Sequence, residues 1–148
     1  ESFNNKDFEK SFKGIKFVQD NESRSNFGVL RGIHFQKYPH EQSKLVKVIK
    51  GEIQDIIVDL RSDSLTYKKY ISIIISDKTK EQIFIPKGFG HAFLTLSKEA
   101  IVSYKIDNYY NKEYEHGVRY DDKSLNISWL LDNKDIIISH KDELLPCL

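Results

Sequence analysis

The stretch that decides the fold is residues 53–60, Ile53-Gln54-Asp55-Ile56-Ile57-Val58-Asp59-Leu60. Along an extended strand Ile56, Val58 and Leu60 would face one way and Ile57 and Asp59 the other. Residues 70–76 repeat this alternation. Further short runs rich in Ile, Val, Tyr and Phe cover residues 15–19, 29–36, 45–49, 82–85, 92–96 and 101–106, with turn-forming residues clustered at 51, 61–64, 77–80 and 86–90. Strands this short and this regularly spaced predict an all-β fold, either a sandwich or a barrel-like roll.

The two ends of the chain depart from this pattern. The segment from Asn5 to Phe12 predicts a short helix, because Phe8 and Phe12 share a face among polar neighbours. The segment from Asn108 to Leu148 is polar and irregular, and it predicts loops with a short helix or two packed outside the β core. No repeat, low-complexity tract or linker divides the 148 residues, so we expect one domain over residues 1–148.

The composition excludes several classes of partner. The 23 lysines and arginines nearly balance the 22 aspartates and glutamates, and a net charge of +1 gives no electrostatic reason to expect nucleic acid or an acidic membrane as partner. No apolar run approaches the roughly 20 residues needed to span a bilayer. Cys147 is the only cysteine, so no intrachain disulfide is possible, and no secretory signal is visible. We expect a cytoplasmic protein.

An arginine and a histidine interrupt the strand Val29-Leu30-Arg31-Gly32-Ile33-His34-Phe35-Gln36. A charge in an apolar strand gains nothing unless a partner or ligand satisfies it, and histidine exchanges protons near neutral pH. The strand therefore indicates a small-molecule site with Arg31 as anion holder and His34 as candidate base, or else two polar side chains that face water. An unbroken strand would place them on opposite sides, whereas a bulge at Gly32 would bring them together.

A second histidine follows a tight turn, in Pro86-Lys87-Gly88-Phe89-Gly90-His91. The turn resembles the Pro-x-Gly-x-x-His metal motif of cupin barrels, but the partner motif His-x-His stands here as His34-Phe35-Gln36. Two imidazoles lack the third protein ligand that a catalytic metal usually needs, so we predict a cupin cavity without metal. This also disfavours a metal-dependent oxygenase. In the alternative interpretation, His91 only caps the turn.

Four further side chains are candidates for chemistry. Lys44 shares the apolar face of its predicted strand, so it either snorkels to water or points into a cavity and holds a developing oxyanion. Tyr104 faces inward in its strand, either as a core tyrosine or as a general acid. Tyr109 and Tyr110 could stack on a planar ring or pack at the barrel mouth. The sequence around Asp142 is typical of a solvated surface charge.

Together, these stretches resemble the nucleotide-sugar 3,5-epimerase family over nearly the whole chain. The segments that carry the resemblance are 17–25, 28–36, 44–52, 58–61, 85–91, Tyr104-Lys105, Tyr109-Tyr110, Asp121-Asp122 and 139–142. The resemblance implies a cupin jelly roll with a few short peripheral helices, a homodimer, and no metal or other cofactor. It also implies that the family's first strand, which reaches into the neighbouring subunit's site, lies largely before Glu1.

The resemblance further implies a substrate and a role for each site residue. The substrate would be a nucleoside-diphosphate 4-keto-6-deoxy sugar, epimerised through an enolate. His34 would be the base, Asp142 would orient it, Lys44 would stabilise the enolate and Tyr104 would be the acid. Binding of the substrate would fall to Arg31, Gln19, Asn21, Ser23, His91 and Tyr110. Three alternatives stay open: a single-centre epimerase, an epimerase of a GDP-linked 4-keto heptose, and a cupin that binds a sugar nucleotide without turnover.

Overall fold

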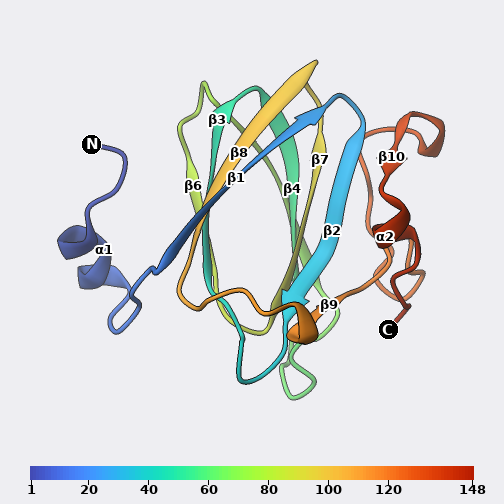
Figure 1. The fold of residues 1–148 in the computed structure, drawn as a ribbon. Helices are drawn as coiled ribbons and strands as arrows, with labels where there is room; N and C mark the ends of the chain where they lie inside the picture. The colour runs from blue at the N-terminus through green and yellow to red at the C-terminus, as the bar shows by residue number, and fades with distance from the viewer.

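The computed structural model describes residues 1–148 as two β-sheets that face each other (Figure 1). The four-stranded sheet has the order β1-β8-β3-β6, and the larger sheet has the order β10-β2-β7-β4-β5, with β9 paired to β2. The strands are β1 Gln19–Asn26, β2 Val29–Gln36, β3 Lys44–Lys50, β4 Glu52–Asp59, β5 Tyr70–Ser76, β6 Gln82–Ile85, β7 Phe89–Thr95, β8 Glu99–Ile106, β9 Glu115–Gly117 and β10 Ile137–Ile138. Only the short β10–β2 pair is parallel. The predicted all-β sandwich is confirmed.

The core lies on both sides of β4. Ile53 and Ile57 pack between the sheets with Val46, Phe93 and Val102, whereas Ile56 and Val58 pack in a second cluster with Ile33, Ala92, Val118 and Leu125. The alternation predicted along this strand is therefore confirmed. The odd-numbered side chains of β4, Asp55 included, face the space between the sheets.

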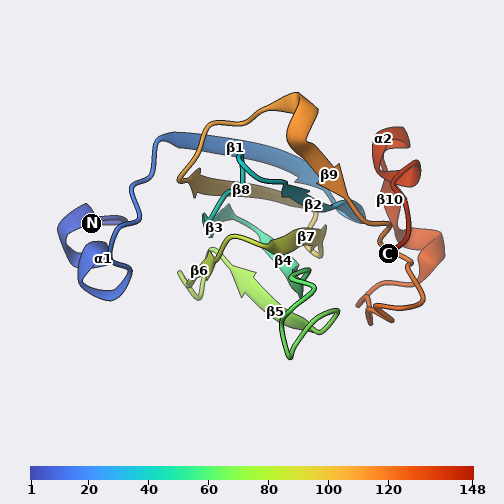
Figure 2. The same cartoon turned by 90° about the horizontal axis from the view of Figure 1, so that it is seen from below.

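The ends of the chain flank the sandwich on opposite sides. Helix α1, Asn5–Ser11, lies at one side (Figure 1). The helix predicted from Asn5 to Phe12 is therefore confirmed, and it ends one residue earlier. The Asn4 side chain caps its first turn. The last forty residues first cross the end of the sandwich and then, from β9 onward, lie at the other side against β2, as both views show (Figure 2). They form the 3-10 helices η1 Lys112–Tyr114 and η2 Asn133–Asp135, the short strands β9 and β10, and helix α2 His140–Glu143.

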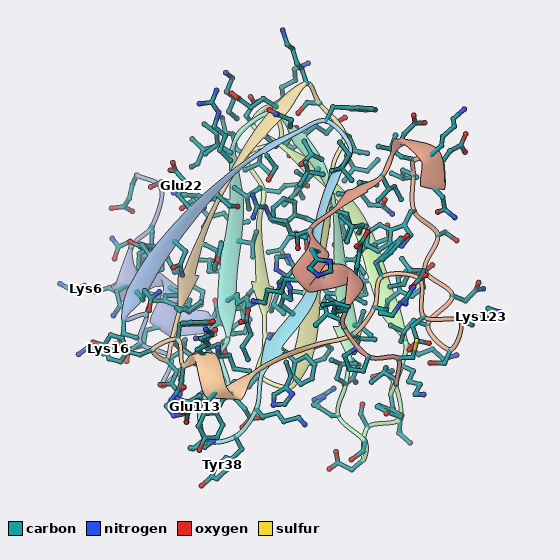
Figure 3. All side chains as sticks on the ribbon, turned by 45° about the vertical axis from the view of Figure 1, so that its right-hand side comes forward. Lys6, Lys16, Glu22, Tyr38, Glu113 and Lys123 are labelled. Carbon is teal, nitrogen blue, oxygen red and sulfur yellow. The ribbon has the colours of Figure 1, made fainter.

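Two of the sequence predictions are wrong in detail. Residues 15–18 are not a strand, and the first strand is the polar segment β1, Gln19–Asn26. Its even-numbered residues are exposed, as Glu22 shows, while the odd-numbered ones are covered (Figure 3). An apolar run could not mark this strand, because its inner face lines a polar cavity. The two short strands of the C-terminal segment were also not predicted, since β9 has three residues and β10 two. No helix of the protein is long and apolar enough to cross a membrane.

Candidate active site

The space between the sheets opens into two adjoining cavities at the C-terminal flank. The larger, of about 430 Å³, lies among strands β2, β3, β7 and β8 and the segment that carries α2. The smaller, of about 210 Å³, shares His34, Lys44 and Tyr104 with it and extends toward the chain after β8. All ten site residues named from the sequence line one or both: Gln19, Asn21, Ser23, Arg31, His34, Lys44, His91, Tyr104, Tyr110 and Asp142.

A bulge in β2 turns Arg31 and His34 toward the same cavity. The register with β7 shifts between these two residues, and Gly32 between them has φ of +109°. A Cβ at this glycine would lie 2.5 Å from the carbonyl oxygen of His91, so the two strands approach too closely for a side chain. The predicted bulge at Gly32 is confirmed. His34 is partly buried at the cavity wall, whereas Arg31 lines the cavity and is also exposed to water.

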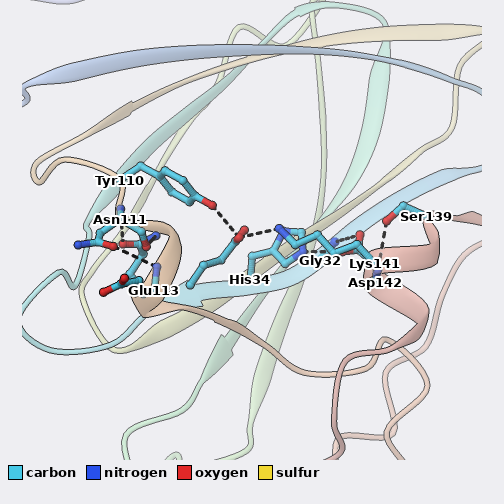
Figure 4. Close-up of polar contacts among 10 residues, drawn as sticks. Gly32, His34, Tyr110, Asn111, Glu113, Ser139, Lys141 and Asp142 are labelled. Carbon is cyan, nitrogen blue, oxygen red and sulfur yellow. Dashed lines mark hydrogen bonds and ion pairs between the residues drawn. The ribbon is translucent and has the colours of Figure 1, made fainter.

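His34 and Asp142 form a hydrogen-bonded pair across the cavity wall. Nε2 of His34 lies 2.7 Å from Oδ1 of Asp142, and the Gly32 amide donates to Oδ2 at 3.2 Å. The Ser139 side chain caps α2 by accepting from the Asp142 amide, which fixes the carboxylate beside the ring (Figure 4). Burial raises the pKa of Asp142, but the His34 and Gly32 hydrogen bonds outweigh it and the net pKa is below the usual value. The local sequence predicted a solvated surface charge at Asp142. That prediction is wrong, because Asp142 is buried.

Lys44 and Tyr104 line both cavities from the four-stranded sheet. Burial lowers the pKa of Lys44 to about 8, although Asp55 and Glu115 counteract part of the shift. Burial also raises the pKa of Tyr104, so its hydroxyl keeps its proton at neutral pH. Nζ of Lys44 lies 6.0 Å from the centroid of the Tyr104 ring. An ammonium group and a phenol thus face the same space as His34.

Polar side chains from β1 and β2 extend the site. Arg31 donates from Nε to the Ser25 hydroxyl at 2.9 Å, which holds its guanidinium against β1. Gln19 donates to the Asn21 side chain at 2.8 Å. The Ser23 hydroxyl is buried and has no hydrogen-bond partner in the protein. An unpartnered polar atom at a cavity wall is available to a ligand.

Tyr110 stands at the mouth of the smaller cavity and is half-exposed. Its hydroxyl donates to Oε2 of Glu115 at 2.8 Å, and this hydrogen bond raises its pKa. In Figure 4, Tyr110 and Asp142 lie on opposite sides of His34. Tyr109 is more exposed than Tyr110 and lines neither cavity.

Two cavity residues and one buried carboxylate behind the cavity wall were missed from the sequence. Oε2 of Glu115 also accepts from Nζ of Lys141 at 2.6 Å, which ties α2 to β9. Burial raises the pKa of Glu115, but the hydrogen bonds from Lys141 and Tyr110 lower it by more. The net pKa is below its usual value, so the carboxyl stays ionised. Both residues stand in polar segments that carried no local signal. Asp55 did carry one, as a carboxylate inside an apolar strand.

His91 is buried and paired with that carboxylate, rather than a cap of the turn before it. Its Nε2 lies 2.7 Å from Oδ2 of Asp55, and its ring lines the larger cavity beside its register neighbour His34. No three His, Cys, Asp or Glu side chains are grouped closely enough to hold a metal ion.

The comparison with known proteins places this chain among sugar-nucleotide epimerases. The family model described as dTDP-4-dehydrorhamnose 3,5-epimerase matches residues 1–148. The dTDP-4-dehydrorhamnose 3,5-epimerase of Methanothermobacter thermautotrophicus is 48% identical over 143 residues, which cover 96% of this chain and 77% of that protein.

Two crystal structures of similar proteins contain ligands. The enzyme of the same name from Bacillus anthracis, solved with TDP and PPi bound, superposes with a TM-score of 0.96 at 46% identity, over 100% of this chain and 84% of that one. The epimerase RmlC of Legionella pneumophila, in complex with dTDP-4-keto-L-rhamnose, gives a TM-score of 0.95 at 42% identity, over 99% of this chain and 78% of that one. A match over the whole chain in both sequence and fold shows that this chain belongs to the dTDP-4-dehydrorhamnose 3,5-epimerase family, isomerases with the cupin fold.

Proposed function

We propose that this protein inverts C3 and C5 of a nucleoside-diphosphate 4-keto-6-deoxy sugar, converting dTDP-4-dehydro-6-deoxyglucose into dTDP-4-dehydrorhamnose. The observation that carries the proposal is that a His–Asp pair, a protonated tyrosine and a lysine line one cavity. Inversion at a carbon beside a ketone needs a base to remove the proton and a separate acid to return one from the other face. A module that only binds the sugar nucleotide has no need of both.

The chemistry proceeds through an enolate. The C4 ketone acidifies the hydrogens at C3 and C5, and His34 takes one of them while the C–H electron pair moves into the enolate. Asp142 keeps the His34 ring oriented and stabilises the imidazolium that forms. The Lys44 ammonium stabilises the enolate oxygen, an effect of about 3 kcal/mol for one well-placed donor. Tyr104 then donates its proton to the same carbon from the opposite face, and both groups re-equilibrate with water.

The remaining cavity residues are assigned to substrate binding. The planar guanidinium of Arg31 matches a diphosphate, and the unpartnered Ser23 hydroxyl lies in the same cavity to donate to a phosphate oxygen. The half-exposed ring of Tyr110 suits stacking on the nucleobase, with the amides of Gln19 and Asn21 in the same smaller cavity. His91 borders the sugar end.

We extend the proposal to the setting of the enzyme. It would act as a single domain over residues 1–148, in a homodimer in the cytoplasm, without a metal or other cofactor, on a route that supplies a deoxysugar for a surface polysaccharide. The support is the family membership and the near-neutral charge, which favours neither nucleic acid nor membrane as partner.

Proton NMR in deuterium oxide tests the proposed reaction. With dTDP-4-keto-6-deoxyglucose, the C3 and C5 proton signals should disappear as deuterium enters, and a new set of H1, H2 and methyl signals from the epimerised product should grow. Loss of only one signal would instead mark a single-centre epimerase, and faster exchange with a GDP-linked 4-keto sugar would change the substrate class. A folded protein that binds TDP but exchanges neither proton would overturn the proposal in favour of a binding module.

A further inference from the structure

A second histidine–carboxylate pair, of which only the histidine lines the cavity, is left unused by the proposed reaction steps. His91 and Asp55 come from neighbouring strands, β7 and β4, and their side chains are 8% and 0% exposed. Oδ2 of Asp55 is hydrogen-bonded to His91, whereas Oδ1 is buried and has no hydrogen-bond partner. An ionisable group on the inner face of a core strand costs free energy, so a purely structural position would be filled better by an apolar residue.

The pair constrains which atom of His91 the cavity can use. A carboxylate accepts but does not donate, so Nε2 of His91 must carry the proton in this contact. The structure gives Nδ1 no hydrogen bond within the protein, and the ring lines the larger cavity. Asp55 therefore leaves Nδ1 as the ring nitrogen available to substrate.

Asp55 also acts electrostatically on Lys44. Among the anions near this lysine, Asp55 is the first to favour the charged ammonium and Glu115 the second. The other charged or titratable groups that line the two cavities are Arg31 and His34 on β2, His91 on β7, Tyr104 on β8, Tyr110 before η1, and Lys141 and Asp142 on α2. Arg31 and Lys141 are cations, and they oppose a third positive charge. Asp55 lines neither cavity, and it offsets these cations from its buried place behind His91.

We infer that Asp55 is a positioning residue for the enolate-stabilising side of the site: it holds His91 with Nδ1 toward the substrate. This inference rests on the proposed function and adds a residue that touches no reacting atom. Its role would be exerted through His91 and Lys44.

The test compares Asp55→Asn with Asp59→Asn. Both replace a buried aspartate on the inner face of β4 with an amide of the same size, but Asp59 binds Arg61, Ser64 and Thr66 away from the cavities. We expect Asp55→Asn to lower kcat/KM by about 10- to 100-fold, as for other carboxylates that orient a functional histidine. The alkaline limb of its kcat/KM profile should move about one unit to lower pH, because Lys44 loses a neighbouring anion. The affinity for TDP should stay unchanged, and Asp59→Asn should keep the wild-type profile.

Several outcomes would overturn the inference. An Asp55→Asn enzyme with the wild-type pH profile, or one that resembles Asp59→Asn in every readout, would leave Asp55 a structural role only. If Asp55→Asn does not fold, nitrogen-15 NMR of the His91 ring in the wild-type enzyme provides the test. The inference requires a proton on Nε2. A neutral ring that carries its proton on Nδ1 alone would refute it. Absence of deuterium exchange with the wild-type enzyme would overturn the proposed function. The NMR of His91 does not depend on turnover, so it would still show whether Asp55 fixes the protonated nitrogen of the ring.

Discussion

At the scale of single residues, His34 and Tyr104 should fail in different ways when each is altered. His34→Asn removes the base, so deuterium exchange at C3 and C5 should fall by about 10²- to 10⁴-fold while TDP affinity is nearly retained. Tyr104→Phe removes only the returning proton, so epimerisation should fall more than exchange does. The ratio of exchange to product, measured by NMR, separates them. An equal loss of both in Tyr104→Phe would contradict its role as the acid.

Lys44 links activity and stability to pH with opposite signs. Its pKa falls from 10.5 in the unfolded reference to about 8 in the protein, mainly through burial. Between these values the unfolded chain binds the extra proton, so the contribution of Lys44 to stability rises with pH across this window. Activity should decline above about pH 8, because the neutral amine no longer stabilises the enolate.

A Lys44→Met variant isolates this effect from other titrations. It should be more stable than the wild type at pH 7, and the difference in free energy of unfolding should shrink as the pH approaches 10.5. Urea unfolding at a series of pH values measures it. A difference that stays constant with pH would show that the amine is solvated, and would remove the basis for its role in the cavity.

The sequence predicted the site residues unevenly, for physical reasons. Arg31 and His34 stood out because charges inside an apolar strand need a partner, and the bulge at Gly32 followed from their spacing. Asp142 lies 108 residues from His34 in a polar segment, so nothing local marks it as buried. Only the resemblance to a family identified it. Lys141 lies in the segment 139–142 that carries the resemblance, but the resemblance assigns it no role, and Glu115 lies outside every such segment. Their pairing depends on how the last forty residues fold back.

At the scale of elements, the bulge of β2 is the feature on which the site most depends. Gly32→Ala would place a Cβ 2.5 Å from the His91 carbonyl and 2.9 Å from Ala92 in the next strand, at a φ of +109°. The strands must separate, which would displace His34 from Asp142 and cost on the order of 1–3 kcal/mol. We expect a lower Tm together with a loss of kcat that exceeds any change in TDP affinity. Thermal melting and exchange kinetics on the same variant test this.

Gly14→Ala provides the matched control. This glycine also has a positive φ, +80°, but a Cβ there meets nothing within 4 Å, and the residue lies after α1, away from the cavities. The variant should lose some stability from backbone strain alone, with activity intact. Wild-type kinetics for Gly32→Ala would show that the bulge tolerates a side chain, and that His34 does not depend on it.

The strands were predicted well wherever they bury apolar side chains. The predicted bounds of β2, β5 and β6 match the structure, and β3, β4, β7 and β8 differ by up to three residues at an end. By contrast, β1 failed because its covered residues, Gln19, Asn21 and Ser23 among them, face a cavity rather than the core. An apolar pattern reports burial against other side chains and cannot report burial against a ligand.

At the scale of the whole molecule, stability and catalysis draw on different parts of the sandwich. The apolar cluster between the sheets is built from strands of both, and it supports the walls that carry Lys44, His91 and Tyr104. The exposed surface of β5 is apolar as well, with Ile71 and Ile74 at least half-exposed. A core position and a position on this face therefore make a matched pair.

Ile53→Ala and Ile74→Ala remove the same atoms from these two environments. Ile53 is 0% exposed between the sheets, whereas Ile74, on the adjacent strand, is 50% exposed. The first change should cost about 2–5 kcal/mol through lost burial and a cavity, and lower Tm by roughly 5–15 °C, and the second should cost less than about 1 kcal/mol. Both should retain exchange activity at 25 °C. Equal losses in the two variants, with the loss at Ile74 dependent on protein concentration, would instead mean that a second copy covers β5 in solution. A lower molar mass of Ile74→Ala than of the wild type by light scattering would then place the proposed homodimer contact on that face.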